Sequence, residues 1–294
     1  MKRDIHIYGQ QSDTTWLVLL KKHRLKPNEQ VSTLRMVINS PFIEPYQIVS
    51  LACLIEEYHL SGASIEFARN NSLADEYLNY IRFFEYWTQG YDRNAFTESR
   101  KKTTLALWKI SQQRISSHAD GSQKYFENLH FPGKDLSALY IALTELFNNI
   151  YDHANSKVEG FSITQYYPKS NQINTAVCDF GVGIPTTIKK LWESKGKKLE
   201  SDADAIRASF VTRISIQTTP QNRGFGLSNL LGNIQRVKGE LTVYSNSAML
   251  QFLGNSVRYE LLSNSIEGTL IKFSFNPNNL QEKEQEFDNE EFIF

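Results

Sequence analysis

The hydrophobic and polar positions along the second half of the chain repeat with the periods of helices and strands. Residues 137–154 carry apolar side chains at helical spacing, which predicts one helix that follows Pro132-Gly133 and has Asp135 or Ser137 as its N-cap. A second helix is predicted through about Val237. Alternation of apolar and polar residues predicts strands over 161–167, 173–179, 241–245, 257–262 and 269–275.

The first half of the chain is predicted to begin with a smaller strand-and-helix unit. Strands are expected over 4–8, 15–20, 33–38 and 63–67, and an amphipathic helix from Pro45 to His59 precedes the last of them.

Residues 71–132 are harder to interpret. The aromatic stripe from Tyr77 to Trp87 predicts a packed helix in a segment that links the two units, and residues 105–108 indicate a strand or another buried element. An aromatic ligand platform is the less favoured alternative for this stripe. His118 is expected to lie in a loop.

Three polar residues share one face of the predicted helix over 137–154. Glu145, Asn149 and His153 are spaced i, i+4 and i+8, so their side chains point into the same space. An amide oxygen can complete a Mg²⁺ octahedron whose other ligands are phosphate oxygens and water, and a carboxylate can orient or deprotonate a nucleophile. Taken alone, the helix is more simply explained by a solvated polar face.

The strand that ends at Asp179 leads directly into two glycines. A buried carboxylate at this position can accept a hydrogen bond from the amino group of adenine, which would discriminate against guanine. Gly181 and Gly183 would allow the backbone to approach a ligand and to take positive φ angles. A strand followed by an ordinary tight turn is the simpler alternative.

A second glycine pair, Gly224 and Gly226, opens the next predicted helix. Backbone amides at a helix N-terminus can cradle phosphates, and Arg223 is placed to add a charge-assisted contact. Dinucleotide-binding and P-loop sites fit less well, because no GxGxxG follows a first strand and no GxxxxGK[ST] is present.

In this order and at these spacings, the three segments resemble the N, G1 and G2 boxes of the GHKL ATPase superfamily, which includes gyrase, Hsp90, histidine kinases and MutL. Glu267-Gly268-Thr269 resembles the last nucleotide-contacting Gly-Thr of that family. The resemblance implies an α+β fold of the Bergerat type, a two-layer sandwich with helices on one face of a mixed sheet, and it implies ATP and Mg²⁺ as ligands. It assigns Glu145 as the general base and Asn149 as the Mg²⁺ ligand, and it places the nucleotide against Asn149, His153, Asp179, Gly181, Gly183, Ile184, Arg223, Gly224, Phe225, Gly226, Leu227 and Thr269.

Two further features are expected of this ATP-binding domain, residues 133–276. The polar interval between the glycine pairs, about 186–222, corresponds to the mobile ATP lid of the family, and its lysines either reach phosphates or form a solvated surface. The alternation over 271–275, with Lys272 and Ser274 between apolar residues, predicts a sheet with one face open to solvent.

The N-terminal unit, residues 1–70, resembles a STAS domain, the fold of anti-sigma-factor antagonists. Phosphorylatable antagonists carry Ser or Thr at the start of the central helix, where this chain has Glu44, Pro45, Tyr46 and Gln47. The resemblance therefore implies a docking or regulatory unit. The acidic tail, 277–294, is expected to be disordered, with its terminal Phe292-Ile293-Phe294 as an alternative docking peptide.

Composition narrows the function further. The 294 residues carry 32 basic and 32 acidic side chains, and this balance argues against an electrostatic nucleic-acid binder. No apolar run is long enough to span a membrane or to form a signal-peptide core, and the two cysteines, Cys53 and Cys178, are expected to be buried thiols. We therefore expect a cytoplasmic protein.

The sequence leaves two function classes open. One is an enzyme that hydrolyses ATP or transfers its γ-phosphate to a Ser or Thr of a partner protein, because a STAS-like unit with a GHKL-like domain resembles bacterial partner-switching regulators. The alternative is a nucleotide-gated interaction module with little or no catalysis. The identity of the partner and the formation of a homodimer are not determined by the sequence.

Overall fold

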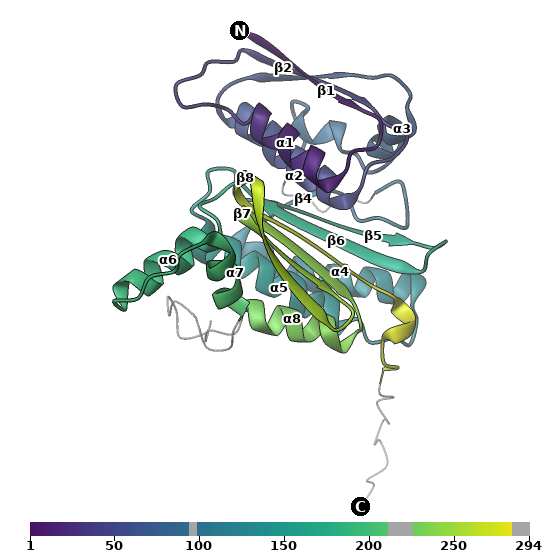
Figure 1. Ribbon diagram of the computed structural model, residues 1–294. Coiled ribbons are helices and arrows are strands. Elements are labelled where there is room, and N and C mark those ends of the chain that lie inside the picture. The colour runs from purple at the N-terminus through teal and green to yellow at the C-terminus, as the bar shows by residue number, and fades with distance from the viewer. Residues whose placement is uncertain (94–98, 211–225, 284–294) are drawn as a thin grey trace, which may run out of the picture.

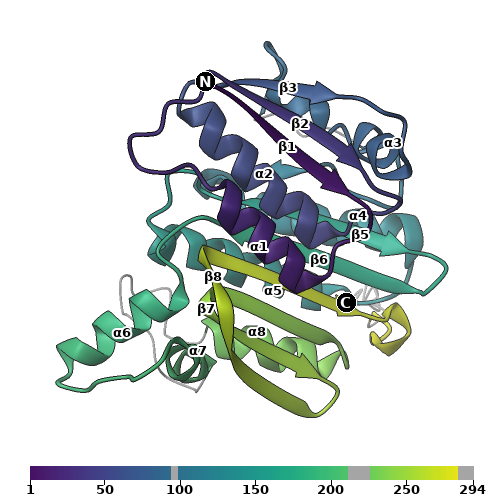
Figure 2. The same ribbon diagram turned by 45° about the horizontal axis from the view of Figure 1, so that its top comes forward.

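The computed structural model describes residues 1–93, 99–210 and 226–283, which form a mixed α+β fold with two sheets. Seen from the side, the elements stack in four layers: a small sheet, two helices, a larger sheet and a second set of helices (Figure 1). The same order of layers is visible when the molecule is turned (Figure 2).

The N-terminal unit is a three-stranded parallel sheet with the order β1-β2-β3. Its two connecting helices lie on the same side of this sheet, facing the larger one (Figure 1). The elements are β1 (Lys2–Tyr8), α1 (Asp13–His23), β2 (Thr33–Asn39), α2 (Pro45–Leu60) and β3 (Ser64–Ala68).

One predicted strand in this unit is wrong: residues 15–20 lie in helix α1. The Ser12 side chain accepts a hydrogen bond from the Thr15 amide and caps the helix. Trp16 and Leu20, four residues apart, are buried on one face. The β-branched and aromatic residues that suggested a strand are overridden by this cap and by burial on a helical period.

Residues 71–132 contribute to both halves of the molecule. The aromatic part packs into the core of the N-terminal unit, whereas the remainder supplies an edge strand and a long helix to the larger sheet. The elements are α3 (Leu73–Tyr80), a 3₁₀ turn at Phe84–Trp87, β4 (Trp108–Lys109), a 3₁₀ turn at Gln112–Arg114 and α4 (Ile115–His130).

His118 lies in helix α4, so its placement in a loop is wrong. The helix buries Ala119, Ser122 and Phe126 at spacings of three and four, which a sequence with Gly121 in its middle does not reveal. The His118 ring stacks on Trp108 at 3.6 Å between centroids, and burial lowers the pKa of His118 to about 3.

The larger sheet has five strands in the order β4-β5-β6-β8-β7, and every neighbouring pair is antiparallel. Residues 257–262 and 269–275, predicted as two strands, belong to one long strand, and a register shift at Asn246 bends its partner. The remaining elements are α5 (Ser137–Asn149) with a π-helical turn (Ile150–Ala154), β5 (Phe161–Tyr167), β6 (Gln172–Asp179), α6 (Ile184–Ser194), α7 (Asp202–Phe210), α8 (Gly226–Arg236), β7 (Glu240–Leu253), β8 (Ser256–Phe275) and a 3₁₀ turn (Pro277–Asn279).

Both faces of this sheet are covered, so the expectation of one open face is wrong. Helices α4, α5 and α8 pack below it, while α1 and α2 of the N-terminal unit pack above it (Figure 1). Along β6, Ile173 and Val177 belong to the lower core and Ala176 and Cys178 to the upper one. Lys272 was expected to face solvent, but its ammonium group faces helix α1, where it donates to Asp13 at 2.6 Å.

The described part of the predicted lid contains two helices of different character. Helix α7 packs against β7 through Ala205, Ile206 and Phe210, so the expectation of little apolar surface is wrong there. Helix α6 buries only Pro185 and Ile188, and it projects from the side of the molecule (Figure 1). Within the described ranges, none of the helices is both long and apolar enough to cross a membrane.

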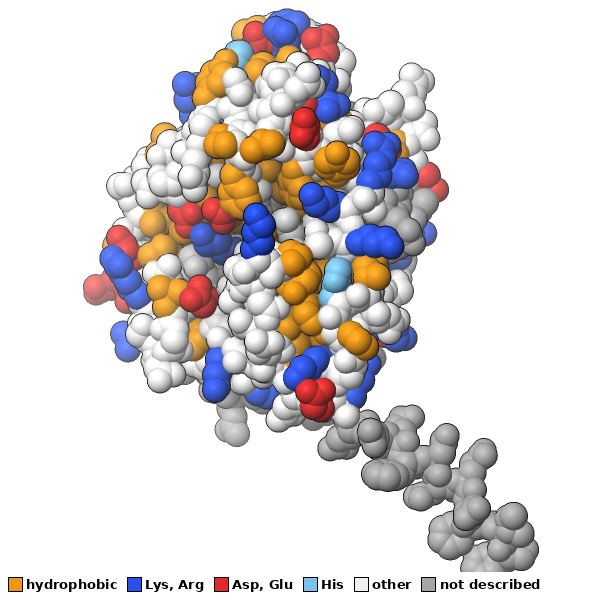
Figure 3. All heavy atoms as spheres, turned by 90° about the vertical axis from the view of Figure 1, so that its right-hand side faces the viewer, with side chains coloured by type: hydrophobic (Ala, Val, Ile, Leu, Met, Phe, Trp, Pro, Cys, Tyr) orange, Lys and Arg blue, Asp and Glu red, His pale blue; other side chains and the backbone are white. Residues whose placement is uncertain are grey.

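The face of the molecule shown in Figure 3 is mixed in chemistry. Hydrophobic side chains run through its middle, and basic and acidic side chains lie among them (Figure 3). Charges of both signs on one face agree with the equal numbers of basic and acidic residues in the chain.

Candidate functional site

Helix α5 carries Glu145 near its C-terminal end, where it faces the start of helix α8. Asn229, in the first turn of α8, donates from Nδ2 to Glu145 Oε1 at 3.4 Å. Burial raises the pKa of Glu145, and the hydrogen bond from Asn229 opposes this effect only in part. A half-buried carboxylate with a raised pKa is suited to accept a proton near neutral pH.

Asn149 is the last residue of α5, one turn beyond Glu145. Its Nδ2 atom is buried and has no hydrogen-bond partner in the described part of the chain. The oxygen and nitrogen of an amide exchange places when the group rotates, so either atom can occupy this position. An unsatisfied amide of this kind is what a bound polar group or ion would engage.

The helix does not end at Asn149 but widens into the π-helical turn Ile150–Ala154. Asn155 then takes a left-handed conformation with φ 45° and ends it. Such turns are common at functional sites because they change the direction of side chains within a helix. His153 lies in this turn, and its side chain is outside the described part of the structure.

Asp179 ends strand β6 and is almost fully buried. Its Oδ1 accepts a hydrogen bond from the Gly181 amide at 2.7 Å, and no hydrogen bond within the described ranges engages Oδ2. Burial raises the pKa of Asp179 to about 7, although the Gly181 amide and the positive charge of Arg24 both act to lower it. The second oxygen remains the one that could accept from a ligand.

Two glycines allow the chain to fold closely around Asp179. Gly268 has φ 114°, and a Cβ atom there would lie 2.2 Å from the Asp179 carbonyl oxygen. Gly183 has φ 79°, and its Cβ would lie 2.3 Å from Oδ1 of Asn246. A side chain at Gly268 would displace the backbone at Asp179 and Phe180, and one at Gly183 would displace the Asn246 side chain; both positions also have the positive φ that favours glycine. Gly181, which we expected to share this conformation, does not have a positive φ.

Ser245 and Asn246 connect this turn to the rest of the sheet. Ser245 Oγ accepts from the Ile184 amide at 2.9 Å and donates to the Gly268 carbonyl at 2.9 Å. Asn246 donates from Nδ2 to the Val182 carbonyl at 3.1 Å. Together they fix the start of helix α6. Neither residue could be recognised from the sequence, because a Ser-Asn pair at the end of a predicted strand carries no distinguishing signal.

The structure brings the two principal predicted segments to neighbouring positions. At Gly160, a Cβ atom would lie 3.0 Å from both the Cys178 carbonyl oxygen and Cδ1 of Ile150, so the end of α5 meets the end of β6 there. Thr269 pairs with Asp179 in the register of β8 against β6.

The second glycine pair is described only in part. Arg223, Gly224 and Phe225 lie outside the described residues. Gly226 begins helix α8, and Leu227 packs against the lower core. The α8 start nevertheless lies beside Glu145, through the hydrogen bond from Asn229.

These residues are compatible with a magnesium nucleotide. Mg²⁺ in such sites is held by one or two protein oxygens together with phosphates and water. A site of this type does not require several protein ligands, and within 1–93, 99–210 and 226–283 no three His, Cys, Asp or Glu side chains form a group that could hold a metal. The unsatisfied amide of Asn149 is the group that fits such an ion.

Comparison with known proteins adds no family to this description: neither a protein-family model nor a curated protein matches the chain.

Proposed function

We propose that the chain binds magnesium ATP in the manner of the GHKL ATPases. The observation that carries the proposal is the buried amide group of Asn149, whose Nδ2 position has no hydrogen-bond partner within the described ranges. Asn149 lies one helical turn from Glu145 and directly before Ile150, whose side chain approaches Gly160 beside the end of β6. The sequence order of these groups is the order of the family's motifs, and two contacts support the proposal: Asn229 with Glu145, and Thr269 with Asp179.

In this proposal Asp179 and Thr269 hold the adenine. Asp179 Oδ2 accepts from the exocyclic amino group, which guanine lacks at that position. Because a charged acceptor makes the stronger hydrogen bond, binding strengthens as pH rises through the Asp179 pKa of about 7. We expect ATP to bind at least tenfold more tightly than GTP, since a buried polar group left unpaired costs about 1–3 kcal/mol.

Asn149 would hold the magnesium ion through its amide oxygen, and Glu145 would act on the nucleophile. The ion supplies charge neutralisation to the phosphates when it is bound. Glu145, with its raised pKa, would accept the proton of an attacking water or of a Ser or Thr hydroxyl on a partner protein. Hydrolysis and transfer to a partner use the same residues.

The test combines binding and turnover. Calorimetry with Mg-ATP and Mg-GTP should show binding of ATP with the stated preference. Glu145→Gln should bind ATP with wild-type affinity and lose turnover by about 10²–10⁴-fold, because it keeps the shape of the side chain but not its basicity. Absence of any adenine nucleotide binding by the wild type contradicts the proposal.

The fate of the γ-phosphate separates the function classes. With γ-labelled ATP, free label indicates hydrolysis, and label on a protein in host lysate indicates a kinase. The gated module is favoured by the small buried surface of α6. The hydrogen bond from Ile184 to Ser245 fixes the start of this helix, but beyond it little apolar packing opposes a movement that would break polar contacts such as Lys189 to Asp202. For such a module, a non-hydrolysable analogue would protect α6 from protease while no label is released.

A further inference from the structure

Arg24, the first residue after helix α1, joins the N-terminal unit to the candidate site. Its guanidinium carbon lies 3.9 Å from the centre of the Phe180 ring, and Nη1 donates to the Glu267 carbonyl at 2.9 Å. On the other side, Nε donates to both carboxylate oxygens of Glu57 on α2, at 3.0 and 3.1 Å. Arg24 is therefore held by its own unit and contacts the other through two different groups.

The two groups that Arg24 contacts flank the proposed adenine contacts. Phe180 lies between Asp179 and Gly181, and Glu267 lies two residues before Thr269. Asp179 and Thr269 are partners in the β6–β8 register. A planar guanidinium that stacks on Phe180, just beyond the end of β6, and donates to Glu267 within β8 fixes the relative position of the two segments.

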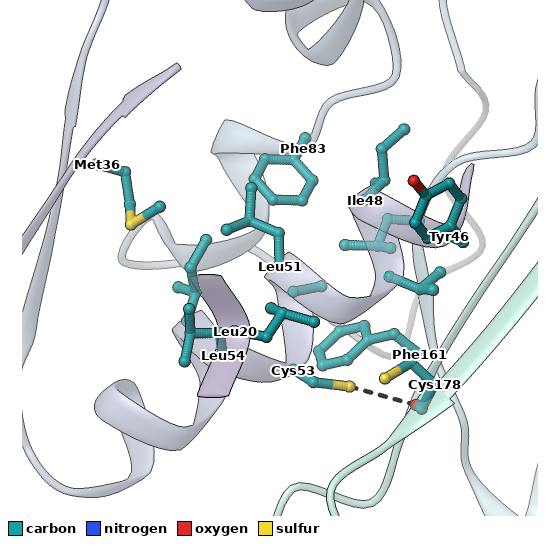
Figure 4. Packing of buried hydrophobic residues seen from close by; sticks show 14 of the residues in the cluster. Leu20, Met36, Tyr46, Ile48, Leu51, Cys53, Leu54, Phe83, Phe161 and Cys178 are labelled. Atoms are coloured by element: carbon teal, nitrogen blue, oxygen red, sulfur yellow. Dashed lines mark hydrogen bonds between the residues drawn. The ribbon is translucent and has the colours of Figure 1, made fainter. Parts of the chain in front are cut away.

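A second contact from helix α2 reaches the same strand end. The Cys53 thiol donates to the Cys178 carbonyl oxygen at 3.2 Å, one residue before Asp179 (Figure 4). This contact at Cys178 and the stacking of Arg24 on Phe180 come from different parts of the N-terminal unit, yet they flank Asp179 on both sides. The N-terminal unit thus contacts the strand end that carries Asp179, in addition to covering one face of the sheet.

Arg24 also acts on Asp179 through its charge. The other titratable or charged groups packed around this strand end are Cys53, Glu57, Cys178 and Glu267. Burial raises the pKa of the Cys53 thiol, so it stays neutral near pH 7, and Glu57 is ion-paired with Arg24 itself. The positive charge of Arg24 lowers the pKa of Asp179 against the larger effect of burial.

We propose that Arg24 is a positioning residue for the adenine contacts, through which the N-terminal unit sets the nucleotide affinity of the site in its own chain. The effect of Arg24 on nucleotide affinity rests on the proposed function. The positioning of the turn at Asp179–Gly183 by Arg24 can be measured without any nucleotide.

The chain supplies a matched control in Arg69. Arg69 Nε donates to both carboxylate oxygens of Asp75 at 2.9 and 3.0 Å, and its guanidinium lies 4.2 Å from the centre of the Phe84 ring. Arg24 makes the same two kinds of contact with Glu57 and Phe180, and in addition donates to the Glu267 carbonyl, whereas both partners of Arg69 belong to the N-terminal half. Arg69→Met therefore loses the same kinds of contact without touching the candidate site.

The first experiment is hydrogen exchange of the full chain without nucleotide. Arg24→Met should raise the exchange rate of the amides at 180–183 by about tenfold, the factor that corresponds to one lost hydrogen bond to a charged group. Arg69→Met should leave these amides at the wild-type rate and affect only its own surroundings. Equal exchange at 180–183 in wild type and Arg24→Met overturns the positioning role.

The second experiment measures Mg-ATP affinity between pH 5.5 and 9. Arg24→Met should bind about tenfold more weakly at pH 7, and the pH at which binding reaches half its maximum should rise, because the Asp179 pKa rises when the positive charge is removed. Arg24→Lys keeps the charge but not the stacking plane, so it should keep the wild-type midpoint while binding more weakly. Arg69→Met should match wild type in both quantities.

The outcomes separate this inference from the proposed function. If the wild type binds ATP and Arg24→Met binds it with the same affinity and pH midpoint, the proposed function stands and the inference is wrong. If the wild type binds no adenine nucleotide, the proposed function fails together with the effect on affinity. In that case, increased exchange in Arg24→Met still supports the positioning role, and unchanged exchange overturns it.

Discussion

The two faces of the five-stranded sheet are buried by different kinds of contact. Toward helices α4, α5 and α8, the sheet presents apolar side chains, among them Ile173, Leu241 and Phe273. Toward α1 and α2, apolar packing is interrupted by polar contacts, such as those that Lys272 and the Cys178 carbonyl make with the N-terminal unit.

This difference suggests separate roles for the two faces, one in the stability of the sheet and one in the position of the candidate site. Apolar burial is non-directional, so the lower face stabilises the domain without fixing one orientation of each helix. Hydrogen bonds and ion pairs hold only in one geometry, and one of those on the upper face, from Cys53 to the Cys178 carbonyl, lies at the end of β6 beside Asp179. We infer that the lower face stabilises the sheet and the upper face positions the site.

The largest expected effect tests whether both faces belong to one cooperative core. Phe147 on α5 and Phe161 on β5 are both completely buried, one on each face. Phe147→Ala and Phe161→Ala should each lower the free energy of unfolding by about 3–5 kcal/mol. Urea denaturation followed by circular dichroism should show a single transition for both variants.

The control for this pair is Leu129→Ala on α4, since Leu129 is 41% exposed. It should change stability by less than about 0.5 kcal/mol. If Phe161→Ala lowers the free energy of unfolding by less than about 1 kcal/mol, or unfolds with a separate early transition, the N-terminal unit docks weakly on an independently stable sheet. That result would contradict a single core that includes both faces.

The local elements of this molecule could be predicted wherever one signal dominated. The helix from Ser137 follows from periodicity alone, because its buried positions recur at helical spacing. Helix α1 was missed because its residues have high strand propensity and its helical form depends on a cap and on burial against α2.

The contacts between the two halves could not be predicted. Lys272 alternates with apolar residues, and this is the pattern of an open face; only the position of Asp13 in space shows that Lys272 forms a partly buried ion pair. Glu145, Asn149 and Asp179 could be proposed because helical spacing and strand ends are local features. Arg24 could not, because its partners Phe180 and Glu267 lie far away in the sequence.

A second prediction concerns the buried carboxylate of Asp179. Its pKa in the folded state, about 7, is above the ordinary value of 3.8, so its stabilising contribution is complete below pH 4 and is lost as pH rises through 7. Asp179→Asn removes the charge and keeps the acceptor for the Gly181 amide. The free energy of unfolding of the variant, relative to that of wild type, should therefore increase by on the order of 2–3 kcal/mol from pH 5 to pH 8.

Thermal melting of wild type and Asp179→Asn across this pH range measures the difference. Ser245→Ala serves as the control, because it disturbs the same turn without removing a titrating group. A stability difference between wild type and Asp179→Asn that is constant with pH would mean that Asp179 is not a buried carboxylate titrating near neutrality.

The smallest expected effect tests the polar contacts of the upper face directly. Burial alone would raise the pKa of Asp13, but hydrogen bonds from Lys272 and Tyr244 outweigh it and lower that pKa. Lys272→Met keeps the apolar length of the side chain and removes the charge. We expect this substitution to lower the free energy of unfolding by about 1–2 kcal/mol at pH 7. The effect is smaller than for a fully buried pair, because Asp13 remains partly accessible to water.

The pH dependence gives this prediction its sharpest test. A carboxylate with a lowered pKa contributes stability above its ordinary pKa and loses it as pH falls, so the difference between wild type and Lys272→Met should shrink from pH 7 to pH 3. Lys2→Met is the control, since it breaks an exposed pair with Glu66 and should change stability by less than about 0.5 kcal/mol at any pH. If Lys272→Met behaves like Lys2→Met, the polar contacts of the upper face contribute no more than surface pairs, and apolar packing must hold the N-terminal unit in register.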